Sequence, residues 1–208
     1  MTVDEIVQRV GERSRRLASG LPVSGPPLGS DFSLNGVVPQ PSSFREAAVL
    51  VAVVRREAEL TLLLTQRTDD MPSHAGQIAF PGGRRQAEDA DAVATALRET
   101  EEEVGLSRSF VEVIGAVDQY RTGTGYEITP IVGIVTPGFT IHADPREVAD
   151  VFEVPLAHFL DEKNHRIDSR VAQGRERRFY AMPYGERYIW GATAGMLKNL
   201  HFILTTAV

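Results

Sequence analysis

The chain of 208 residues contains no cysteine, and this absence removes several kinds of chemistry at once. Disulfide bonds, thiolate zinc sites and a cysteine nucleophile are all excluded. Long hydrophobic runs are lacking too, so no segment is apolar enough to span a membrane. The first residues lack the basic start and apolar core of a secretory signal. We therefore expect a cytoplasmic protein with no membrane partner.

An excess of positive charge is also missing. The chain carries 22 Lys and Arg residues against 28 Asp and Glu residues, which gives a net charge of −6. Non-specific binding to nucleic acid needs a basic surface, so we expect no nucleic-acid partner. An acidic protein can still bind a phosphorylated small molecule, provided that a local cluster of cations or a bound metal ion meets the phosphates.

Two regions of the chain differ in composition. A T-x-x-E capping box at Thr2, followed by apolar residues at helical spacing, predicts a short amphipathic helix. The stretch from Ser19 to Arg45 is rich in Pro, Gly and Ser and indicates an extended connection. We expect an N-terminal extension at 1–45 and a single folded domain at 46–208.

Short apolar runs and helical patterns alternate through this second region. The predicted strands cover residues 47–55, 59–67, 76–83, 111–120, 128–135 and 149–155, with a further hairpin at 177–190. The predicted helices cover 89–104, a short segment after 155, and 191–204. Because strands outnumber the interspersed helices, the fold class is α+β, as a mixed-sheet α/β sandwich.

The run RETEEEVG places four glutamates near the end of a predicted helix, where like charges repel and oppose the helix dipole. On a helix of about 100° per residue, Glu99, Glu102 and Glu103 share an arc about 100° wide, whereas Glu101 points elsewhere. Three converging carboxylates suit a hard divalent cation such as Mg²⁺ or Mn²⁺. The alternative is a solvated acidic face in which Arg98 pairs with Glu101 or Glu102.

Cationic residues precede this helix. Arg67 and His74 lie upstream of the sequence FPGG, whose glycines allow a tight turn beside a ligand. Arg84 and Arg85 follow it directly. A strand, a glycine turn, cations and a carboxylate-bearing helix within some forty residues favour a ligand that combines metal and phosphate, although each feature alone fits ordinary loop chemistry.

The segment resembles the signature of the Nudix hydrolase family, G-x5-E-x7-R-E-U-x-E-E-x-G-U, in which U is usually aliphatic. Its second half matches from Arg98 to Leu106. In the first half, Gly83 is one residue too far from Arg98, Ala90 stands where the first glutamate belongs, and Asp89 with its neighbour Glu88 is out of register. The resemblance implies a Nudix-type α/β/α sandwich with a mixed β-sheet, preceded here by the N-terminal helix and extended linker.

A narrower resemblance concerns the coenzyme A diphosphatase branch of that family. The stretch LLTQRTDDMPSHAGQIAFPGG is similar to its L-L-T-x-R-[SA]-x3-R-x3-G-x3-F-P-G-G motif, with Thr68 in place of the small residue and Pro72 in place of the second arginine. The implied reaction is hydrolysis of the diphosphate linkage of coenzyme A or its derivatives to 3′,5′-ADP and 4′-phosphopantetheine.

The resemblance also assigns roles. Glu99, Glu102 and Glu103 bind Mg²⁺ or Mn²⁺, Glu102 and Glu103 are catalytic, and Arg98 orients the glutamates. Glu147 is the candidate for a further ligand or general base, with an ordinary exposed glutamate as the equal alternative.

The remaining implied roles concern the substrate. Gly82 and Gly83 are assigned to the substrate site, where the carbonyl of either could add a ligand to the metal ion. The substrate phosphates are assigned to Arg67, His74, Arg84 and Arg85 without a ranking. Tyr120, Tyr126 or Phe80 could stack on the adenine.

Two alternative functions remain open from the sequence. Another Nudix substrate, namely ADP-ribose, NADH or a nucleoside triphosphate, is the nearest rival, although the S-Q-P-W-P-F-P-x-S motif of NADH-cleaving members is absent. The alternative that is not an enzyme is a nucleotide-binding module with the same fold and no catalytic activity. The expected partner is a small-molecule diphosphate, and the sequence leaves a homodimer open.

Overall fold

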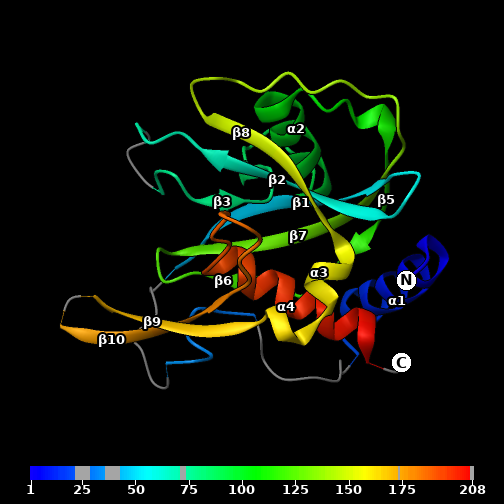
Figure 1. Ribbon diagram of the computed structural model, residues 1–208. Helices are drawn as coiled ribbons and strands as arrows, with labels where there is room; N and C mark the ends of the chain where they lie inside the picture. The colour runs from blue at the N-terminus through cyan, green and yellow to red at the C-terminus, as the bar shows by residue number, and fades with distance from the viewer. Residues whose placement is uncertain (22–28, 36–42, 71–73, 173, 207–208) are drawn as a thin grey trace.

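A mixed β-sheet of eight strands forms the centre of the computed structural model, which describes residues 1–21, 29–35, 43–70, 74–172 and 174–206 (Figure 1). The strands run in the order β3-β2-β1-β7-β5, while β4 pairs with β1, β6 with β7 and β8 with β2. Among the strand pairs of the described residues, β1 and β7 are parallel and the others are antiparallel. Their bounds are β1 Arg45–Arg55, β2 Leu60–Arg67, β3 Ile78–Ala79, β4 Gly82–Arg84, β5 Val111–Ala116, β6 Tyr120–Arg121, β7 Tyr126–Val135 and β8 Val148–Pro155.

Strand β1 is buried on both faces because its apolar residues alternate between two cores. Val49, Val51 and Val53 belong to one core, and Leu50 and Val54 to the other. The first face is covered by α1 (Val3–Ala18), α3 (Leu156–Leu160) and α4 (Ala192–Thr205), the second by α2 (Ala92–Val104) (Figure 1). The predicted α/β/α sandwich is therefore confirmed.

The N-terminal helix is anchored to this core. Thr2 and Glu5 form the predicted capping box, and Ile6 and Val10 are fully buried in the core of the first face. Much of the predicted extended connection, residues 22–28 and 36–42, lies outside the described residues. The division into 1–45 and 46–208 stays a prediction.

Two predicted strands divide in the structure. Residues 76–83 form β3, which pairs with β2, and β4, which pairs with β1. Pro81 stands between them and has no N–H to donate to a ladder. Residues 111–120 likewise form β5 and β6, and the register of β5 against β7 shifts between Val113 and Gly115. Hydrophobicity marked both segments correctly but could not show where the pairing changes.

The predicted hairpin at 177–190 is confirmed in part: the chain turns back at Tyr184 and Arg187, whose backbones exchange hydrogen bonds of 2.9 Å, but the longer pairing of its first strand lies elsewhere. Strand β10 (Arg175–Ala181) pairs with β9 (Arg166–Ala172), a polar strand that has too little apolar patterning to be recognised. Residues after Ala181 do turn back, but only through isolated bridges such as Ala181 to Trp190. Two short 3₁₀ turns complete the elements, η1 at Arg108–Phe110 and η2 at Glu162–Asn164. Among the described residues, no helix is long and apolar enough to cross a membrane.

Candidate active site

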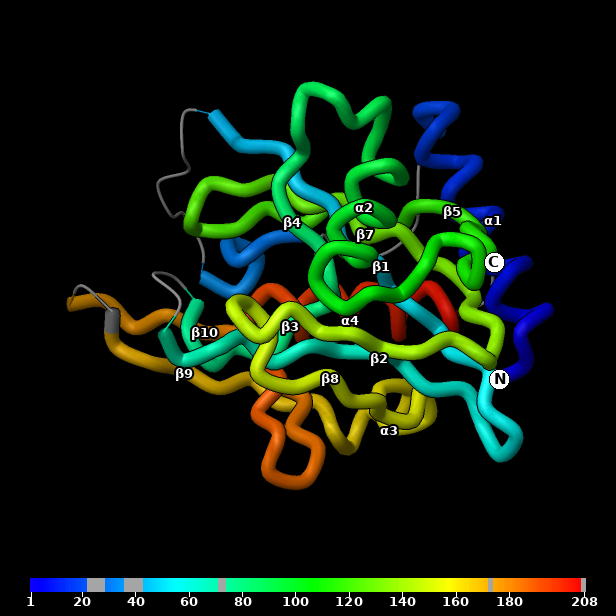
Figure 2. Tube along the Cα trace, turned by 90° about the horizontal axis from the view of Figure 1, so that it is seen from above, coloured from blue at the N-terminus to red at the C-terminus, as the bar shows by residue number. Residues whose placement is uncertain are grey.

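Helix α2 carries the glutamate run and is fixed at both ends. It begins three residues later than predicted because the Asp91 side chain accepts a hydrogen bond from the Ala94 N–H, at 2.8 Å, and caps the N-terminus. It ends where Gly105 adopts a left-handed conformation with φ of 69°. The helix packs against β1 and β4, and Figure 2 shows β4 beside it from above.

Glycines of β4 bring the sheet against two of the predicted metal ligands. The Gly82 N–H donates to Glu103 Oε2 at 3.0 Å. A methyl group at Gly83 would lie 2.5 Å from Glu99 Oε2, so only glycine leaves room for that carboxylate. Glu102 is more exposed, with 58% of its side chain accessible. These contacts make both glycines structural neighbours of the glutamates, while their roles toward substrate stay predictions.

The fourth glutamate is separate, as predicted. Glu101 pairs with Arg108 at 2.9 Å, and this ion pair lowers the pKa of Glu101. The alternative of a solvated acidic face predicted that Arg98 pairs with Glu101 or Glu102, and this is confirmed for Glu102. Arg98 contacts Glu102 at 2.9 Å, but it also contacts Glu99 at 2.9 Å, so it lies between the two carboxylates rather than out in solvent.

Arg98 and Arg67 compensate the negative charge of the glutamates only in part. Burial raises the pKa of Glu103 to about 7, with nearby Glu99 and Glu147 adding to the effect. Burial also raises the pKa of Glu99, to which Glu102 and Glu147 contribute. Glu147 is exposed, and its influence on both carboxyls places its charge near them although it comes from the loop before β8. Tertiary structure thus joins the predicted Glu147 to the helix cluster.

Asp89 is the site residue that sequence analysis missed. It accepts from Arg98 Nε at 2.9 Å and from Arg98 Nη2 at 2.8 Å, a bidentate pair, and it also accepts from Gln86 N–H and the Thr95 hydroxyl. These bonds hold the pKa of Asp89 far below its usual range. The buried carboxylate orients Arg98 toward the glutamates. Register matching selected Ala90, one residue away, but Ala90 has no carboxylate.

Of the two predicted cations upstream of FPGG, only Arg67 contacts a glutamate of the cluster among the described residues. Arg67 Nη1 is 3.8 Å from Glu103 Oε1, and its buried Nε has no hydrogen-bond partner in the described part of the chain. His74 is exposed and its Nδ1 is 2.8 Å from Gln77 Oε1. Pro72, at the position of the missing second arginine, lies outside the described residues.

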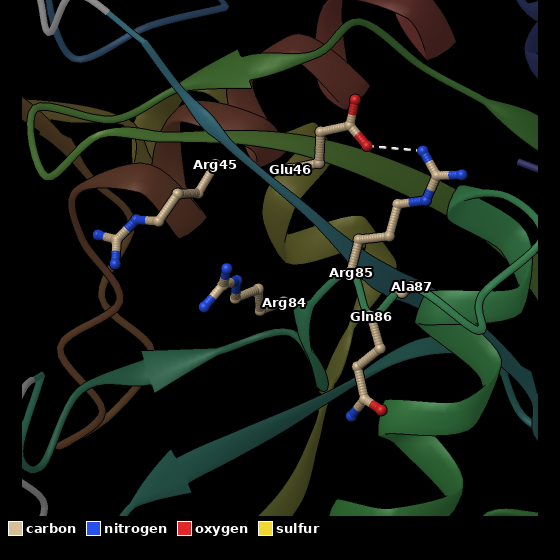
Figure 3. Close-up of a pocket in the computed structure, with 6 residues that line it drawn as sticks. All are labelled: Arg45, Glu46, Arg84, Arg85, Gln86 and Ala87. Carbon is tan, nitrogen blue, oxygen red and sulfur yellow. Dashed lines mark hydrogen bonds and ion pairs between the residues drawn. The ribbon is translucent and has the colours of Figure 1, made fainter.

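The adjacent arginines Arg84 and Arg85 have different surroundings. Arg85 pairs with Glu46 at 2.6 Å, whereas Arg84 has no hydrogen bond or ion pair from its guanidinium to any described residue. Figure 3 shows Arg84 and Arg45 on one side of β1, with Arg85 and Glu46 on the other. They line an open pocket of about 330 Å³. Because the Arg84 carbonyl accepts from Arg98 at 3.3 Å, this pocket adjoins the glutamate cluster.

The three aromatic residues proposed to stack on adenine differ in burial. Phe80 and Tyr120 are buried in the core, which leaves no face for a ligand. Tyr126 is half-buried and lies beneath Arg45, whose guanidinium carbon is 4.1 Å from the ring centroid.

The acidic residues fit a divalent cation. Their donors are all carboxylate oxygens, the set that Mg²⁺ and Mn²⁺ prefer. A buried carboxyl with a pKa near 7 beside further carboxylates is a position where a cation relieves repulsion. The site is therefore a glycine-lined carboxylate cluster on an α/β/α sandwich, with cations at its rim.

Comparison with known proteins agrees with this description. The family model for the NUDIX domain matches residues 44–173. Curated relatives called "Uncharacterized Nudix hydrolase NudL" include proteins of Shigella flexneri, 43% identical over 77% of this chain and 83% of theirs, and Escherichia coli K12, 44% identical over 75% and 81%. The chain belongs to the Nudix hydrolase family. It is a hydrolase of nucleoside diphosphate derivatives, and such enzymes generally use divalent metal ions.

Solved structures are more distant. A Nudix hydrolase from M. smegmatis, RenU, has a TM-score of 0.48 and 20% identity, covering 56% of this chain and 73% of that one. The NUDIX domain of Shewanella oneidensis NrtR, solved with ADP ribose, has a TM-score of 0.44 and 22% identity, covering 61% and 83%.

Removing the charge of Asp89 is expected to weaken metal binding. In Asp89→Asn, Arg98 loses its bidentate partner and competes with the cation for Glu99 and Glu102. Mn²⁺ affinity, measured from the electron paramagnetic resonance of free Mn²⁺, should fall roughly tenfold or more. Asp91→Asn is the matched control, since asparagine caps a helix as well as aspartate. Equal affinities in the two variants would contradict the positioning role of Asp89.

The metal-free cluster is expected to cost stability at high pH. The folded chain binds the Glu103 proton more tightly than the unfolded chain does, so stability falls as pH rises from about 4.5 through about 7. Glu103→Gln keeps an acceptor for the Gly82 N–H and removes the charge. With chelator present, urea unfolding should show it more stable than wild type by about 1–3 kcal/mol at pH 8 and nearly equal below pH 4.5.

The control for this experiment is Glu101→Gln, on the same helix. Its carboxylate pairs with Arg108, so its loss should lower stability slightly at pH 8. If Glu103→Gln also lowered the stability at pH 8, the charge of Glu103 would be fully compensated in the folded chain.

Proposed function

We propose that this Nudix hydrolase cleaves the diphosphate linkage of coenzyme A or its acyl derivatives, in the cytoplasm. The observation that carries the proposal is the pocket beside the glutamate cluster, where the Arg84 guanidinium has no partner among the described residues and Arg45 is stacked on Tyr126. Coenzyme A bears a 3′-phosphate in addition to its diphosphate, so its recognition calls for a second cationic position. The similarity of residues 63–83 to the coenzyme A diphosphatase motif supports the same substrate.

The glutamates of α2 would hold the metal. Glu99, Glu102 and Glu103 supply the carboxylate oxygens, and Mg²⁺ or Mn²⁺ bound there neutralises diphosphate charge and lowers the pKa of a water molecule. Arg98, fixed by Asp89, sets the positions of Glu99 and Glu102 and is a positioning residue.

The remaining residues act on water and substrate. Glu147 is exposed beside the cluster, where its carboxylate could accept a proton from the attacking water. Arg67, whose Nε has no hydrogen-bond partner among the residues that the structure describes, is suited to the diphosphate, and His74 lies on the loop that follows β2. Arg84 and Arg45 are assigned to the 3′-phosphate, whereas Arg85 is assigned to holding the loop before α2 through Glu46 and the carbonyls of Asp89 and Ala90.

A substrate panel tests the proposal directly. The protein is incubated with Mg²⁺ or Mn²⁺ and either coenzyme A, acetyl-coenzyme A, ADP-ribose, NADH or ATP, and products are identified by mass spectrometry. We expect 3′,5′-ADP from coenzyme A at the highest kcat/KM, with Glu102→Gln as the inactive blank. Faster turnover of ADP-ribose or NADH would replace the proposed substrate, and no turnover of any substrate would favour a binding module.

Arg84→Ala separates recognition of the 3′-phosphate from catalysis. Losing one charge-assisted contact should raise KM for coenzyme A roughly tenfold or more, while kcat changes little. Dephospho-coenzyme A lacks the 3′-phosphate, so its KM should be nearly the same for Arg84→Ala and wild type. Arg55→Ala, an exposed arginine at the other end of β1, is the matched control. An equal rise in KM for both substrates would contradict the assigned role.

A further inference from the structure

A second group of potential metal ligands lies on the opposite face of the sheet from α2. Glu162 is in η2, His165 follows this turn directly, and His201 is on α4. One ligand atom from each residue lies within 4.8 Å of the others. Helix α4 covers the sheet face that α2 does not, so this group is separate from the glutamate cluster. No Nudix motif includes these three residues.

The spacing of the group suits tetrahedral coordination. His201 Nε2 and Glu162 Oε1 are 3.3 Å apart. Two ligand atoms bound to one tetrahedral zinc, each about 2.1 Å from it, are separated by roughly 3.4 Å. A zinc ion could therefore lie between these two atoms with little movement of either side chain.

The third ligand is oriented by a backbone carbonyl. His165 Nε2 is 2.8 Å from the carbonyl oxygen of Phe159. A carbonyl can only accept, so Nε2 carries the hydrogen and Nδ1 of the neutral ring carries the lone pair. Zinc-binding histidines are commonly held in this way by a carbonyl or carboxylate at the other ring nitrogen. Burial lowers the pKa of His165 and of His201, which favours the neutral, metal-binding form of both rings.

A lysine already places a positive charge within the group. Lys198 Nζ lies 3.1 Å from Glu162 Oε1 and 3.1 Å from His165 Nδ1. The ammonium thus contacts two of the three prospective ligand atoms. Lys198 is one turn of α4 before His201, and its flexible stem, 21% exposed at the side chain, allows it to swing toward solvent.

We propose that Glu162, His165 and His201 form a zinc site, for which Lys198 acts as a tethered competing cation. Three protein ligands and one water complete a tetrahedral shell. Two imidazoles and a single carboxylate favour zinc over Mg²⁺, in contrast to the all-oxygen cluster on α2. The bound ion joins the segment after α3 to the C-terminal helix and stabilises that junction, without a part in hydrolysis.

Zinc titration of the chelator-stripped protein tests the site, with millimolar Mg²⁺ present to occupy the glutamate cluster. A chromophoric chelator reports the free zinc. We expect wild type to bind one zinc ion that Glu162→Ala, His165→Gln and His201→Gln each lose, and that His142→Gln retains. Glu162 is 72% exposed at its side chain, so its replacement tests the site even where the buried His201 variant fails to fold.

The competing lysine gives a prediction that ordinary surface binding would not. Lys198→Met should bind zinc roughly tenfold more tightly than wild type, because no ammonium must be displaced. Zinc at about a hundred times its dissociation constant should raise the Tm of wild type by on the order of 5 °C and leave the Tm of Glu162→Ala unchanged. Zinc that persists in Glu162→Ala and His165→Gln, or Lys198→Met that binds no tighter than wild type, overturns the proposal.

Discussion

The bidentate pair between Arg98 and Asp89 is the interaction on which the candidate active site depends. Helix α2 gathers several like charges, and such a cluster needs a cation to hold it in one geometry. Arg98 meets this need from within the helix: it contacts Glu99 and Glu102 at 2.9 Å each. Its own position is fixed by Asp89, which lies before the helix begins. The pair is therefore the link between the loop, the helix and the carboxylates of Glu99 and Glu102.

Strand β4 of the sheet contacts two of the glutamates on α2. Glycines of β4 allow the backbone to approach so closely that the Gly82 N–H reaches Glu103 and the Gly83 Cα lies against Glu99. The pairing of β4 with β1 holds this short strand in place and brings Arg84 and Arg45 to one side of β1. The carboxylate cluster and the arginines of the neighbouring pocket are in this way joined through three consecutive residues, Gly82, Gly83 and Arg84, which explains how a chain of net charge −6 can present a local cationic pocket.

Much of the fold could be predicted from the pattern of apolar residues in the sequence. Apolar runs located β1, β2, β7 and β8, and the helices α1, α2 and α4 were found within a few residues. The errors came where local sequence carries little information. The strand Arg166–Ala172 is polar and pairs with β10. Two residues of a later loop contact it: Trp190 lies beneath Arg170, and the Tyr188 hydroxyl donates to Asp168. Asp89 was passed over because register counting assumes a fixed loop length, whereas hydrogen bonds select whichever carboxylate can reach the arginine.

By itself, the sequence determined the identity and convergence of the three glutamates, since helical geometry fixes which side chains share a face. It also determined the absence of thiol chemistry and the position of the strand at 47–55. Tertiary structure alone decided that the charge of Glu147 acts on Glu99 and Glu103, that the Arg84 guanidinium, unlike that of Arg85, has no partner among the described residues, and that Glu162 meets His201 across 39 positions of the chain. Spacing along a helix is a local property, but contact between separate elements is fixed only when the sheet and its covering helices pack.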